Sequence, residues 1–513
     1  MPPRAGAARG APGTPMRLSE AVPLLVLAIS LATGLAVFFL GERRHRLRSA
    51  LNLGGATLKL LLVAAMLWGV SRDHHYETRY ELLPGIDFVL RADPLAMLFI
   101  SLSAVLWLLT TLYAIGYLEG SPQRSRFFGF FSLCITAATG IALAGNLFTF
   151  FLFYELLTLA TYPLVVHRGT DTALHAGKVY LAYTLAGGAV LLVGIAWLYS
   201  LVGPVEFARG GVLSQLPSGQ HGALRAIFVL LIAGLGVKAA LVPLHGWLPV
   251  AMAAPAPVSA LLHAVAVVKA GAFGIVRVVY EVYGIEFAAS LGLLVPLAIT
   301  ACVTIVYGSL RALVQDDLKK RLAFSTVSQV SYIVLGTAVF GPIGTVGGLA
   351  HLVHQGIMKI TLFFCAGNLA ETLGIHRVSE MDGVGRRMPW TLAAFTVAAF
   401  GMIGVPPMAG FISKWTLGLG ALDAHMPWVL GVLVVSSLLN AAYLLPILYA
   451  AWFKPQAGAW PAEMPRGRLE TDWRLLGPPL VTALLTVGAG LFAATPFSPL
   501  DWAKLIATRE YVR

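Results

Sequence analysis

Residues 147–166 read LFTFFLFYELLTLATYPLVV, and this stretch decides the class of fold. Among these 20 residues only Glu155 carries a charge. About 20 apolar residues form a helix long enough to cross the hydrocarbon core of a bilayer. A carboxylate inside such a helix is either protonated or paired with a cation from another helix, and we expect pairing. The stretch therefore predicts a transmembrane helix that carries a functional charge.

The chain as a whole has the composition of a membrane protein. Of its 513 residues, 58% are hydrophobic and 12% are charged, whereas soluble domains carry about 25% charged residues. A soluble globular protein is therefore excluded, and we expect an all-α polytopic membrane protein with about fourteen transmembrane helices. The predicted spans are 21–40, 50–70, 93–117, 127–146, 147–167, 174–202, 224–248, 256–282, 288–314, 321–340, 342–370, 389–422, 426–452 and 476–496.

The first residues differ from the rest of the chain. Residues 1–15 read MPPRAGAARGAPGTP, and this composition predicts a disordered N-terminal tail over residues 1–20. Translation starts either at Met1 or at Met16, which lies just before the first apolar run. We expect that run to be a retained helix, because no clear A-x-A cleavage site follows it.

Signatures of metal, redox and nucleotide chemistry are missing from the sequence. Cys134, Cys302 and Cys365 lie singly in apolar segments, without the CxxC spacing of zinc or iron–sulfur sites. The sequence has no GxxxxGKS/T phosphate loop, no strand-flanked GxGxxG and no HExxH. We therefore expect no cofactor, no bound metal, no nucleic-acid partner and no catalytic centre in this chain.

Basic residues indicate the orientation of the chain. The formal net charge is +12, and Lys and Arg accumulate in the cytoplasmic loops of membrane proteins. Assigned to alternate sides of the predicted spans, 19 lie on one side and 12 on the other, which includes both termini. We therefore expect extracytoplasmic termini in a multi-pass protein of the cell inner (plasma) membrane. The 12 are Arg4, Arg9, Arg17, Arg72, Arg79, Arg91, Arg209, Arg225, Arg277, Lys504, Arg509 and Arg513.

The other five basic residues lie inside predicted spans, at Lys59, Lys238, Lys269, Lys359 and Lys414. A lysine at the centre of a bilayer costs about 2.5–3.5 kcal/mol on insertion scales, so such residues face the bundle interior and are functional candidates by default. Lys59 is the exception, because it lies near the start of its segment and can extend toward the basic cytoplasmic end. We leave it out of the mechanism. Glu155 carries the one carboxylate that we expect inside a span.

Two of these lysines lie beside predicted breaks in a helix. Lys238 in GLGVKAALVPLHGWLP precedes Pro243, and Lys414 in GVPPMAGFISKWTLG follows the two prolines at 406–407. Proline removes a backbone donor and interrupts a helix, and broken helices expose backbone dipoles at the ion sites of transporters. Because one break lies in each half of the chain, we expect an internal duplication of the inverted-repeat type.

The other two lysines are accompanied by histidine. Lys269 follows His263 in LLHAVAVVKAGAFG, and Lys359 follows His351 and His354 in HLVHQGIMKITLFF. Imidazole titrates near neutral pH and passes a proton through either nitrogen, so we interpret these histidines as proton-relay stations. A metal site is the alternative interpretation, and it is disfavoured because no carboxylate or cysteine accompanies the histidines at ligand spacing.

A polar stripe lies on a neighbouring predicted helix, in LAFSTVSQVSYIVLG. Two interpretations remain open for it, hydrogen bonding between helices and the lining of a water-filled path. Its members are Ser325, Ser328, Gln329 and Tyr332.

Four stretches, taken in order, resemble one family. FFLFYELLTLATYPLV, GVKAALVPLHGWLPVAMAAPAPVSALLHAVAVVKAG, KRLAFSTVSQVSYIVLG and GVPPMAGFISKW are similar to the antiporter-like, proton-conducting membrane subunits of respiratory complex I, membrane-bound hydrogenases and Mrp-type sodium/proton antiporters. The resemblance spans residues 85–450, and four motifs in the same order argue against a chance match. The wording around Glu155 and the spacing of His354 and Lys359 are closest to the D-type component of Mrp antiporters, whereas LLHAVAVVKAG is closer to the large A-type component.

The resemblance implies an architecture and a proton path. The architecture is an all-α bundle with two inverted five-helix repeats, at 127–282 and 288–452, each containing a broken helix. Helices at 21–117 precede the repeats, and a C-terminal transmembrane helix and tail at 476–513 follow them. The implied relay consists of the ion pair Glu155 and Lys238, a central pair Lys269 and His263, a continuation through His351, His354 and Lys359, and an exit-side group, Lys414.

The function implied by the resemblance is that of a proton-translocating membrane subunit in a multisubunit cation/proton antiporter of the Mrp type. The alternative is a proton-pumping, antiporter-like subunit of an NADH-quinone oxidoreductase-type complex I, a hydrogenase-like complex or an inorganic-carbon-uptake complex. Both imply other membrane subunits as partners, with protons and, in an antiporter, Na⁺ as transported ions. A catalytic subunit that binds quinone or flavin is a further hypothesis, which the missing flavin, nucleotide and iron–sulfur motifs disfavour. A transporter that acts without partners is a third.

Overall fold

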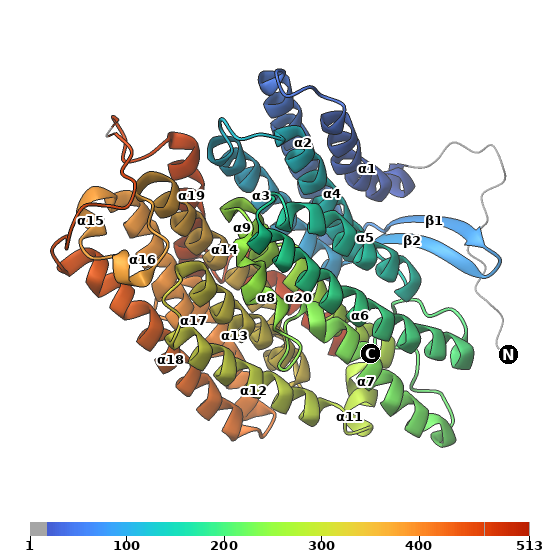
Figure 1. The fold of residues 1–513 in the computed structure, drawn as a ribbon. Helices are drawn as coiled ribbons and strands as arrows, with labels where there is room; N and C mark the ends of the chain where they lie inside the picture. Colours follow the sequence, from blue (N-terminus) through green and yellow to red (C-terminus); the bar gives the residue numbers. More distant parts are fainter. Residues whose placement is uncertain (1–17, 466, 512–513) are drawn as a thin grey trace.

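The chain folds into a bundle of helices (Figure 1), seen in a computed structural model that describes residues 18–465 and 467–511. In the described part, twelve helices are long and apolar enough to cross a membrane. Most of the predicted tail over residues 1–20 lies outside the described residues, as do both candidate start sites. The first helix begins at Leu18.

The elements of the first half, in chain order, are α1 (Leu18–Phe38), α2 (His45–Ser71), β1 (Tyr76–Leu83), β2 (Ile86–Ala92), α3 (Pro94–Tyr117), α4 (Arg124–Leu143), α5 (Leu147–Val165), α6 (Asp171–Val202), η1 (Ser218–Gln220), α7 (His221–Lys238), α8 (Trp247–Val250), η2 (Ala251–Ala253), α9 (Ala256–Ala264), α10 (Val267–Arg277) and a π-helical turn, η3 (Val278–Tyr283).

The elements of the second half are α11 (Ile285–Ser290), α12 (Leu294–Leu313), α13 (Leu318–Ala338), α14 (Pro342–Leu373), η4 (Val378–Glu380), α15 (Val384–Arg387), α16 (Pro389–Ile403), α17 (Ala409–Asp423), α18 (Pro427–Phe453), α19 (Trp473–Leu491) and α20 (Pro499–Tyr511).

Two predicted crossings are not among the twelve spans, for different physical reasons. Helix α13 has 21 residues, but it begins with Lys319, Lys320 and Arg321, which lower its hydropathy. Helices α16 and α17 have 15 residues each, because the chain is broken between them at residues 404–408. The bundle therefore has about 12–14 candidate spans, in agreement with the prediction of an all-α polytopic protein.

Side-chain caps begin several of these helices. Asp93 accepts a hydrogen bond of 2.7 Å from the Ala96 N–H at the start of α3, and Asn146 accepts one of 2.7 Å from the Thr149 N–H at the start of α5. Such caps satisfy backbone donors that have no partner within the helix. A glycine ends α14, because Gly374 directly after this helix adopts φ +71°, a left-handed conformation that suits glycine.

The helix breaks are only partly those that the prolines predict. Helix α7 ends at Lys238, before Pro243, and α16 ends before the two prolines at 406–407, as expected. A further break, which the sequence did not predict, separates α9 from α10 at residues 265–266 inside the predicted span 256–282. The span itself is confirmed as a candidate crossing at Ala256–Tyr283, and the break falls between His263 and Lys269.

Strands occur in one place in the described part, a hairpin of β1 and β2 that extends from the bundle beside α5 (Figure 1). Arg79 and Arg91 fasten it to the connection after α6, through bonds of 2.7 and 2.9 Å to the carboxylate of Glu206. The pKa of Glu206 is lowered, chiefly by the hydrogen bonds from Arg79. The hairpin had not been predicted.

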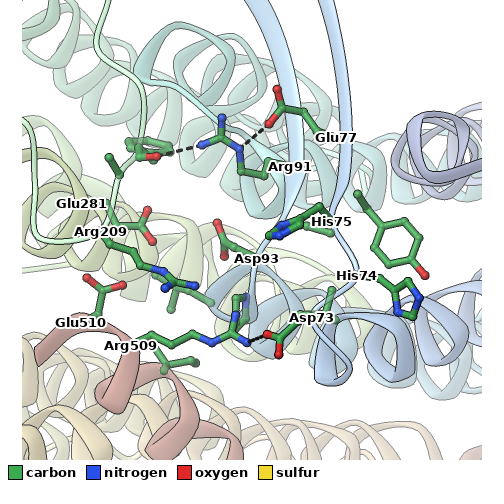
Figure 2. A pocket seen from close by; sticks show the side chains of 18 residues that line it. Asp73, His74, His75, Glu77, Arg91, Asp93, Arg209, Glu281, Arg509 and Glu510 are labelled. Carbon is green, nitrogen blue, oxygen red and sulfur yellow. Dashed lines mark hydrogen bonds and ion pairs between the residues drawn. The ribbon is translucent and has the colours of Figure 1, made fainter. Parts of the chain in front are cut away.

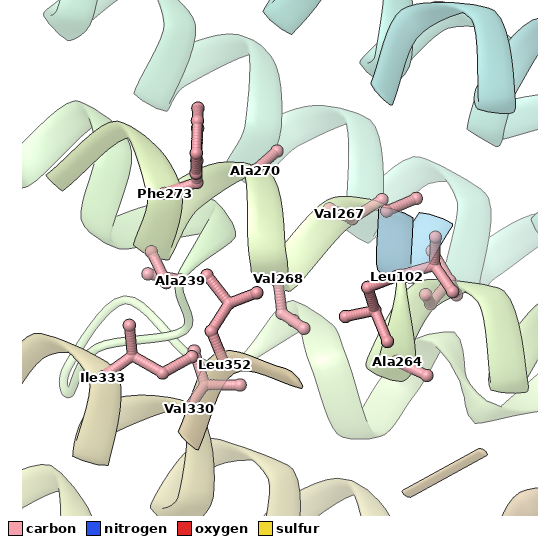
Figure 3. Packing of buried hydrophobic residues seen from close by; sticks show 14 of the residues in the cluster. Leu102, Ala239, Ala264, Val267, Val268, Ala270, Phe273, Val330, Ile333 and Leu352 are labelled. Carbon is pink, nitrogen blue, oxygen red and sulfur yellow. The ribbon is translucent and has the colours of Figure 1, made fainter. Parts of the chain in front are cut away.

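Helix α14 forms the centre of the bundle. It packs against α9, α13, α16, α17, α19 and α20, and it is buried along its most apolar window. Leu352 of α14 lies among Val268 of α10 and Val330 and Ile333 of α13 (Figure 3). Close packing of this kind, rather than transfer out of water, holds helices together in a bilayer. The predicted relay residues are buried in the bundle, apart from Glu155, which is half-buried.

The C-terminal segment contains more structure than the predicted helix and tail. After α19 the chain turns back into α20, which packs on α14 and α3. The Trp502 Nε1–H donates to the Pro94 carbonyl at 2.7 Å, and the Tyr511 hydroxyl accepts a bond of 3.1 Å from the Gly341 N–H. The end of the described chain is therefore part of the bundle.

Candidate functional site

Lys238 lies at the broken end of α7, completely buried. Its Nζ donates to the main-chain carbonyl of Tyr154 and lies 3.4 Å from the centre of the Tyr154 ring. The next residue, Glu155, packs its carboxylate against Gly188 of α6, where a Cβ would leave no room for it. Its Oε1 has no hydrogen-bond partner among the described residues. The structure thus brings Lys238 to the backbone beside Glu155, and a direct ion pair between the two side chains stays a prediction.

Lys269 lies just after the break between α9 and α10. It is completely buried, and its Nζ has no hydrogen-bond partner in the described chain. Two residues further on, Gly271 lets α10 approach the end of α7, because an added Cβ would overlap the Ala239 backbone nitrogen and lie 2.7 Å from the Leu235 carbonyl oxygen. Glycine at this position therefore brings the two helix ends that carry Lys238 and Lys269 into contact.

The three predicted histidines are all buried. The His263 ring stacks on Phe363 of α14, with centroids 4.5 Å apart, and both of its nitrogens lack partners among residues 18–465 and 467–511. His354 likewise has two unpartnered nitrogens within that part of the chain. His351 contacts Ser413 Oγ through Nδ1 at 2.8 Å. Imidazoles with free nitrogens in an apolar interior are suited to exchanging protons rather than to fixing the fold.

Lys359 and Lys414 are held by oxygens at helix ends and hydroxyls. The Lys359 Nζ donates to Ser325 Oγ at 2.6 Å and to the Leu322 carbonyl at 3.2 Å. The Lys414 Nζ donates to the carbonyls of Met402 and Ile403 at 2.7 and 3.1 Å, the last two residues of α16. Those carbonyls form the negative end of the helix dipole, which favours an ammonium group.

Tyr332 connects two of the predicted groups. Its ring stacks on His351, with centroids 5.0 Å apart, and faces the Lys414 Nζ at 5.3 Å. Its hydroxyl and both amide atoms of Gln329 have no partner in the described residues, whereas Ser328 contacts Ser309 of α12 at 2.9 Å. The predicted stripe is thus divided, since Ser325 and Ser328 form hydrogen bonds to other helices, whereas Gln329 and Tyr332 have polar atoms without a partner in the described residues.

Lys59 does not extend toward the cytoplasmic end. It is completely buried, and its Nζ donates to Ser30 Oγ at 3.0 Å and to Thr139 Oγ1. The expectation that it extends toward the basic end was wrong, because hydroxyls on α1 and α4 satisfy the amine within the bundle. Lys59 therefore links three N-terminal helices, away from the other lysines.

Sequence reasoning missed a charged cluster at the end of α10. Arg277, counted above in a loop, is completely buried and donates to Asp93 at 2.7 and 3.1 Å and to Glu281. Glu281 is buried as well, so residue 155 is not the one carboxylate inside a span. The signal was present, because residues 277 and 281 are four apart in an apolar run and share a helix face.

A cavity of about 410 Å³ opens beside this cluster. The side chains of Asp93, Glu281 and Glu510 line this cavity, together with those of Arg209 and Arg509 (Figure 2). Burial, followed by the charges of Glu281 and Asp93, raises the pKa of Glu510 to about 8. The cavity therefore combines titratable carboxylates with fixed arginines at one end of the helix that carries Lys269.

Three further polar residues that sequence reasoning missed lie near the relay. Asn440 and Tyr443 of α18 are completely buried, and they share a helix face because they are three residues apart. Lys319, one of the 19 basic residues counted on the cytoplasmic side, donates to the carbonyls of Met252 and Ala254 at 2.8 and 2.5 Å. No group of three or more His, Cys, Asp or Glu residues with metal-binding geometry occurs in the described residues.

Comparison with known proteins identifies the class to which this fold and this set of buried bases belong. Residues 144–440 match the family described as NADH:quinone oxidoreductase/Mrp antiporter, TM, and residues 85–128 match NADH-Ubiquinone oxidoreductase (complex I), chain 5 N-terminus. The first match covers more than half of the chain, so the chain belongs to this family of antiporter-like, proton-conducting membrane subunits. It is a multi-pass membrane subunit of an Mrp antiporter or of a complex I–type complex.

Individual relatives come from both kinds of complex. The chain is 39% identical over 419 residues to NADH-quinone oxidoreductase subunit N of Desulforudis audaxviator, covering 80% of this chain and 82% of the relative. It is 30% identical over 429 residues to the D component of the Na(+)/H(+) antiporter of Bacillus subtilis, covering 83% and 85%. A chain in the structure of the Mrp complex from Dietzia sp. superposes with a TM-score of 0.86 at 26% identity, covering 97% of this chain and 98% of that one.

Proposed function

We propose that this protein translocates protons along a line of groups that starts at the half-buried Glu155 and the buried Lys238, continues through Lys269 and His263, then through His351, His354 and Lys359, and ends at Lys414. In this proposal the chain supplies the proton path and no redox centre. Other subunits of the complex supply the driving reaction or the second ion.

The unpartnered amine of Lys269, which has no hydrogen-bond acceptor in the described chain, is the observation that carries the proposal. An isolated ammonium group in a low-dielectric interior costs far more than a neutral amine, so the site favours a base that is charged only transiently. The free nitrogens of His263 and His354 have the same property. Lys59, which lies outside the proposed path, differs from Lys269 because Ser30 and Thr139 accept hydrogen bonds from its amine.

Glu155 would control the first step. A carboxylate close to Lys238 favours the ammonium form of that lysine, and its withdrawal favours release of a proton. The free Oε1 of Glu155, together with the tie between Lys238 and the Tyr154 carbonyl, leaves room for both arrangements. Motion of a single side chain would therefore change the proton affinity of Lys238.

The complex that we favour is an Mrp-type cation/proton antiporter. The chain covers nearly the whole of its counterpart in the Dietzia Mrp complex, and it is similar over most of its length to the D components of two sodium/proton antiporters. The second candidate is a respiratory complex of the NADH-quinone oxidoreductase type, which the 39% identity to a subunit N favours. In the first case proton flux would be coupled to Na⁺, and in the second to electron transfer in other subunits.

Two structural proposals accompany this function. The elements α4 to α10 and α12 to α18 each contain a broken helix with a buried lysine, which is consistent with the two inverted repeats predicted at 127–282 and 288–452. The excess of basic residues on one side supports extracytoplasmic termini in the plasma membrane. The β1–β2 hairpin would then be extracytoplasmic too.

The test is transport by the assembled complex in vesicles. The native complex would be purified through a tag on this chain, and its subunits identified by mass spectrometry. Co-purification of Mrp subunits supports the antiporter assignment, whereas NADH- and quinone-binding subunits would replace it with the respiratory one. Lys269→Met should abolish proton transport while the complex still assembles, and Lys59→Met is the matched control. Transport at the wild-type rate by Lys269→Met would refute the relay.

A further inference from the structure

A chain of short hydrogen bonds runs from Lys359 toward Lys414 through Ser325 of the polar stripe and two residues of α18 that no sequence motif marked. The Lys359 Nζ donates to Ser325 Oγ at 2.6 Å, Ser325 Oγ lies 2.6 Å from the Tyr443 hydroxyl, and that hydroxyl donates to Asn440 Oδ1 at 2.6 Å. Ser325, Tyr443 and Asn440 are completely buried. The chain thus connects α14, α13 and α18 inside the bundle.

The far end of this chain meets Lys414 at one carbonyl oxygen. Asn440 Nδ2 donates to the Met402 carbonyl at 3.1 Å, and the Lys414 Nζ donates to the same oxygen at 2.7 Å. A carbonyl oxygen only accepts hydrogen bonds, so the NH₂ group of Asn440 must face Met402. Its Oδ1 must therefore face Tyr443, which fixes the orientation of the amide.

The fixed amide of Asn440 sets the direction of every hydrogen bond between Lys359 and Asn440. Because Oδ1 only accepts, the Tyr443 hydroxyl must donate to it, and the oxygen of Tyr443 is then the acceptor for the Ser325 O–H. Ser325 Oγ in turn accepts from the Lys359 ammonium. Every proton in the chain points away from Lys359 and toward Asn440, the arrangement in which a proton can leave Lys359.

We propose that Ser325 and Tyr443 carry the proton from Lys359 toward Lys414, and that Asn440 is a positioning residue that aims the Tyr443 hydroxyl. The inference rests on the proposed relay and adds to it two proton carriers and one positioning residue.

In the transfer, Lys359 gives one N–H proton to Ser325 Oγ, whose own proton passes to Tyr443. The Tyr443 proton then leaves for the neutral amine of Lys414. The net change is the loss of one proton by Lys359 and its gain by Lys414, with both hydroxyls left as neutral O–H groups that point the other way.

Asn440 lies between Tyr443 and Lys414 in the structure, since its Oδ1 accepts from Tyr443 and its Nδ2 shares the Met402 carbonyl with Lys414. An amide oxygen is far less basic than an amine, so a proton does not rest on Asn440 Oδ1. The Tyr443 hydroxyl must turn away from the amide to reach Lys414, which itself must be free to accept. While Lys414 is an ammonium group bound to Met402 and Ile403 it cannot accept, and the path is closed.

Proton transport by the assembled complex in vesicles tests the inference. Tyr443→Phe removes one oxygen and keeps the ring, and we expect transport to fall about tenfold, which corresponds to about 1.4 kcal/mol of barrier. Tyr113→Phe is the matched control, because Tyr113 is also completely buried and its hydroxyl donates to a backbone carbonyl, that of Phe364, at 2.9 Å. Equal transport by the two variants would overturn the role of Tyr443.

A second pair of variants keeps the inference testable even where Tyr443→Phe does not assemble. Ser325→Ala should lose transport, and Ser325→Thr, which keeps the hydroxyl, should restore most of it. Asn440→Leu should lower the rate and shift its pH profile, because the Tyr443 hydroxyl loses its fixed acceptor, and an unchanged profile would contradict the positioning role. This inference alone would be overturned if the Ser325 variants transported protons at the wild-type rate while Lys359→Met and Lys414→Met were inactive. If the two lysine variants were active, the relay itself would be overturned.

Discussion

Lys238 is bound to the residue that directly precedes Glu155, since its Nζ donates to the Tyr154 carbonyl and lies 3.4 Å from the centre of the Tyr154 ring. The π face and the carbonyl together stabilise an ammonium group without a counter-charge. These contacts hold the Lys238 amine in place independently of Glu155, so in the proposed mechanism a movement of Glu155 changes the charge of Lys238 without displacing it. Tyr154 thus binds the amine of Lys238, while Glu155 would control its charge.

Glu155→Gln and Lys238→Met should each lower proton transport about tenfold or more, equivalent to at least about 1.4 kcal/mol. The reason is that glutamine cannot change charge and methionine cannot carry a proton. Tyr154→Phe removes the hydroxyl, which donates to the Gly234 carbonyl at 3.1 Å, but keeps the ring and the main-chain carbonyl. It should transport at close to the wild-type rate. Measurement of the pH gradient across vesicles tests these expected rates. Wild-type activity of Glu155→Gln would remove Glu155 from the mechanism.

Lys414 offers a test that separates charge from proton transfer. Arginine can make the same bonds to the Met402 and Ile403 carbonyls, but its guanidinium is not deprotonated in proteins. Lys414→Arg should therefore assemble normally and lose transport, and Lys414→Ala should also lose transport while the complex still forms. Native gel analysis reports assembly, and the vesicle assay reports flux. A fully active Lys414→Arg complex would show that this residue serves only as a fixed cation.

Lys59 should tolerate loss of its charge. Replacement of a buried charged group by an apolar one of similar volume is often neutral or stabilising, and methionine fills the same space against the Trp107 ring, which the Lys59 Nζ faces at 5.4 Å. We expect Lys59→Met to keep its transport rate and its thermal stability in detergent. Abolished transport with an intact complex would instead place Lys59 on a proton path.

The spans and the five lysines inside them could be predicted because a bilayer leaves few choices to a backbone. Each polar backbone group must be satisfied within its own segment, so long apolar runs become helices. The breaks after Lys238 and before Lys414 could be predicted for a local reason, the loss of a backbone donor at proline. The expectations that rest on single segments of sequence were therefore the reliable ones.

The remaining features depend on contacts between distant segments. The break between α9 and α10 contains no proline or glycine, and α9 packs on α14, which lies far along the chain. Arg277 reads as a loop residue until Asp93, 184 positions away, is brought beside it. Tyr443 and Asn440 look like ordinary polar residues in an apolar helix until Ser325 and Met402 face them.

Glu510 predicts a pH dependence in the docking of α20. Burial raises the pKa of its carboxyl from 4.5 to about 8, with Glu281 and Asp93 adding to the effect and a Gly210 N–H and Arg277 opposing it. Between these two values the folded chain holds a proton that the unfolded chain has lost, so the docked state becomes less stable as the pH rises from about 4.5 to about 8. Above that range the carboxylate is ionised in both states and the loss is complete.

Glu510→Gln should remove this pH dependence, because the amide stays neutral at every pH. The measurement is hydrogen exchange of the α20 amides at pH 6 and pH 9, as the ratio to the intrinsic exchange rates. The wild-type protein should lose protection at the higher pH, and the Gln variant should keep it. Asp501 lies at the other end of α20 and is not among the residues that line the cavity with Asp93 and Glu281, so Asp501→Asn, which also removes a carboxylate, should follow the wild type. Equal loss of protection in the wild type and Glu510→Gln would show that ionisation of another group loosens the helix.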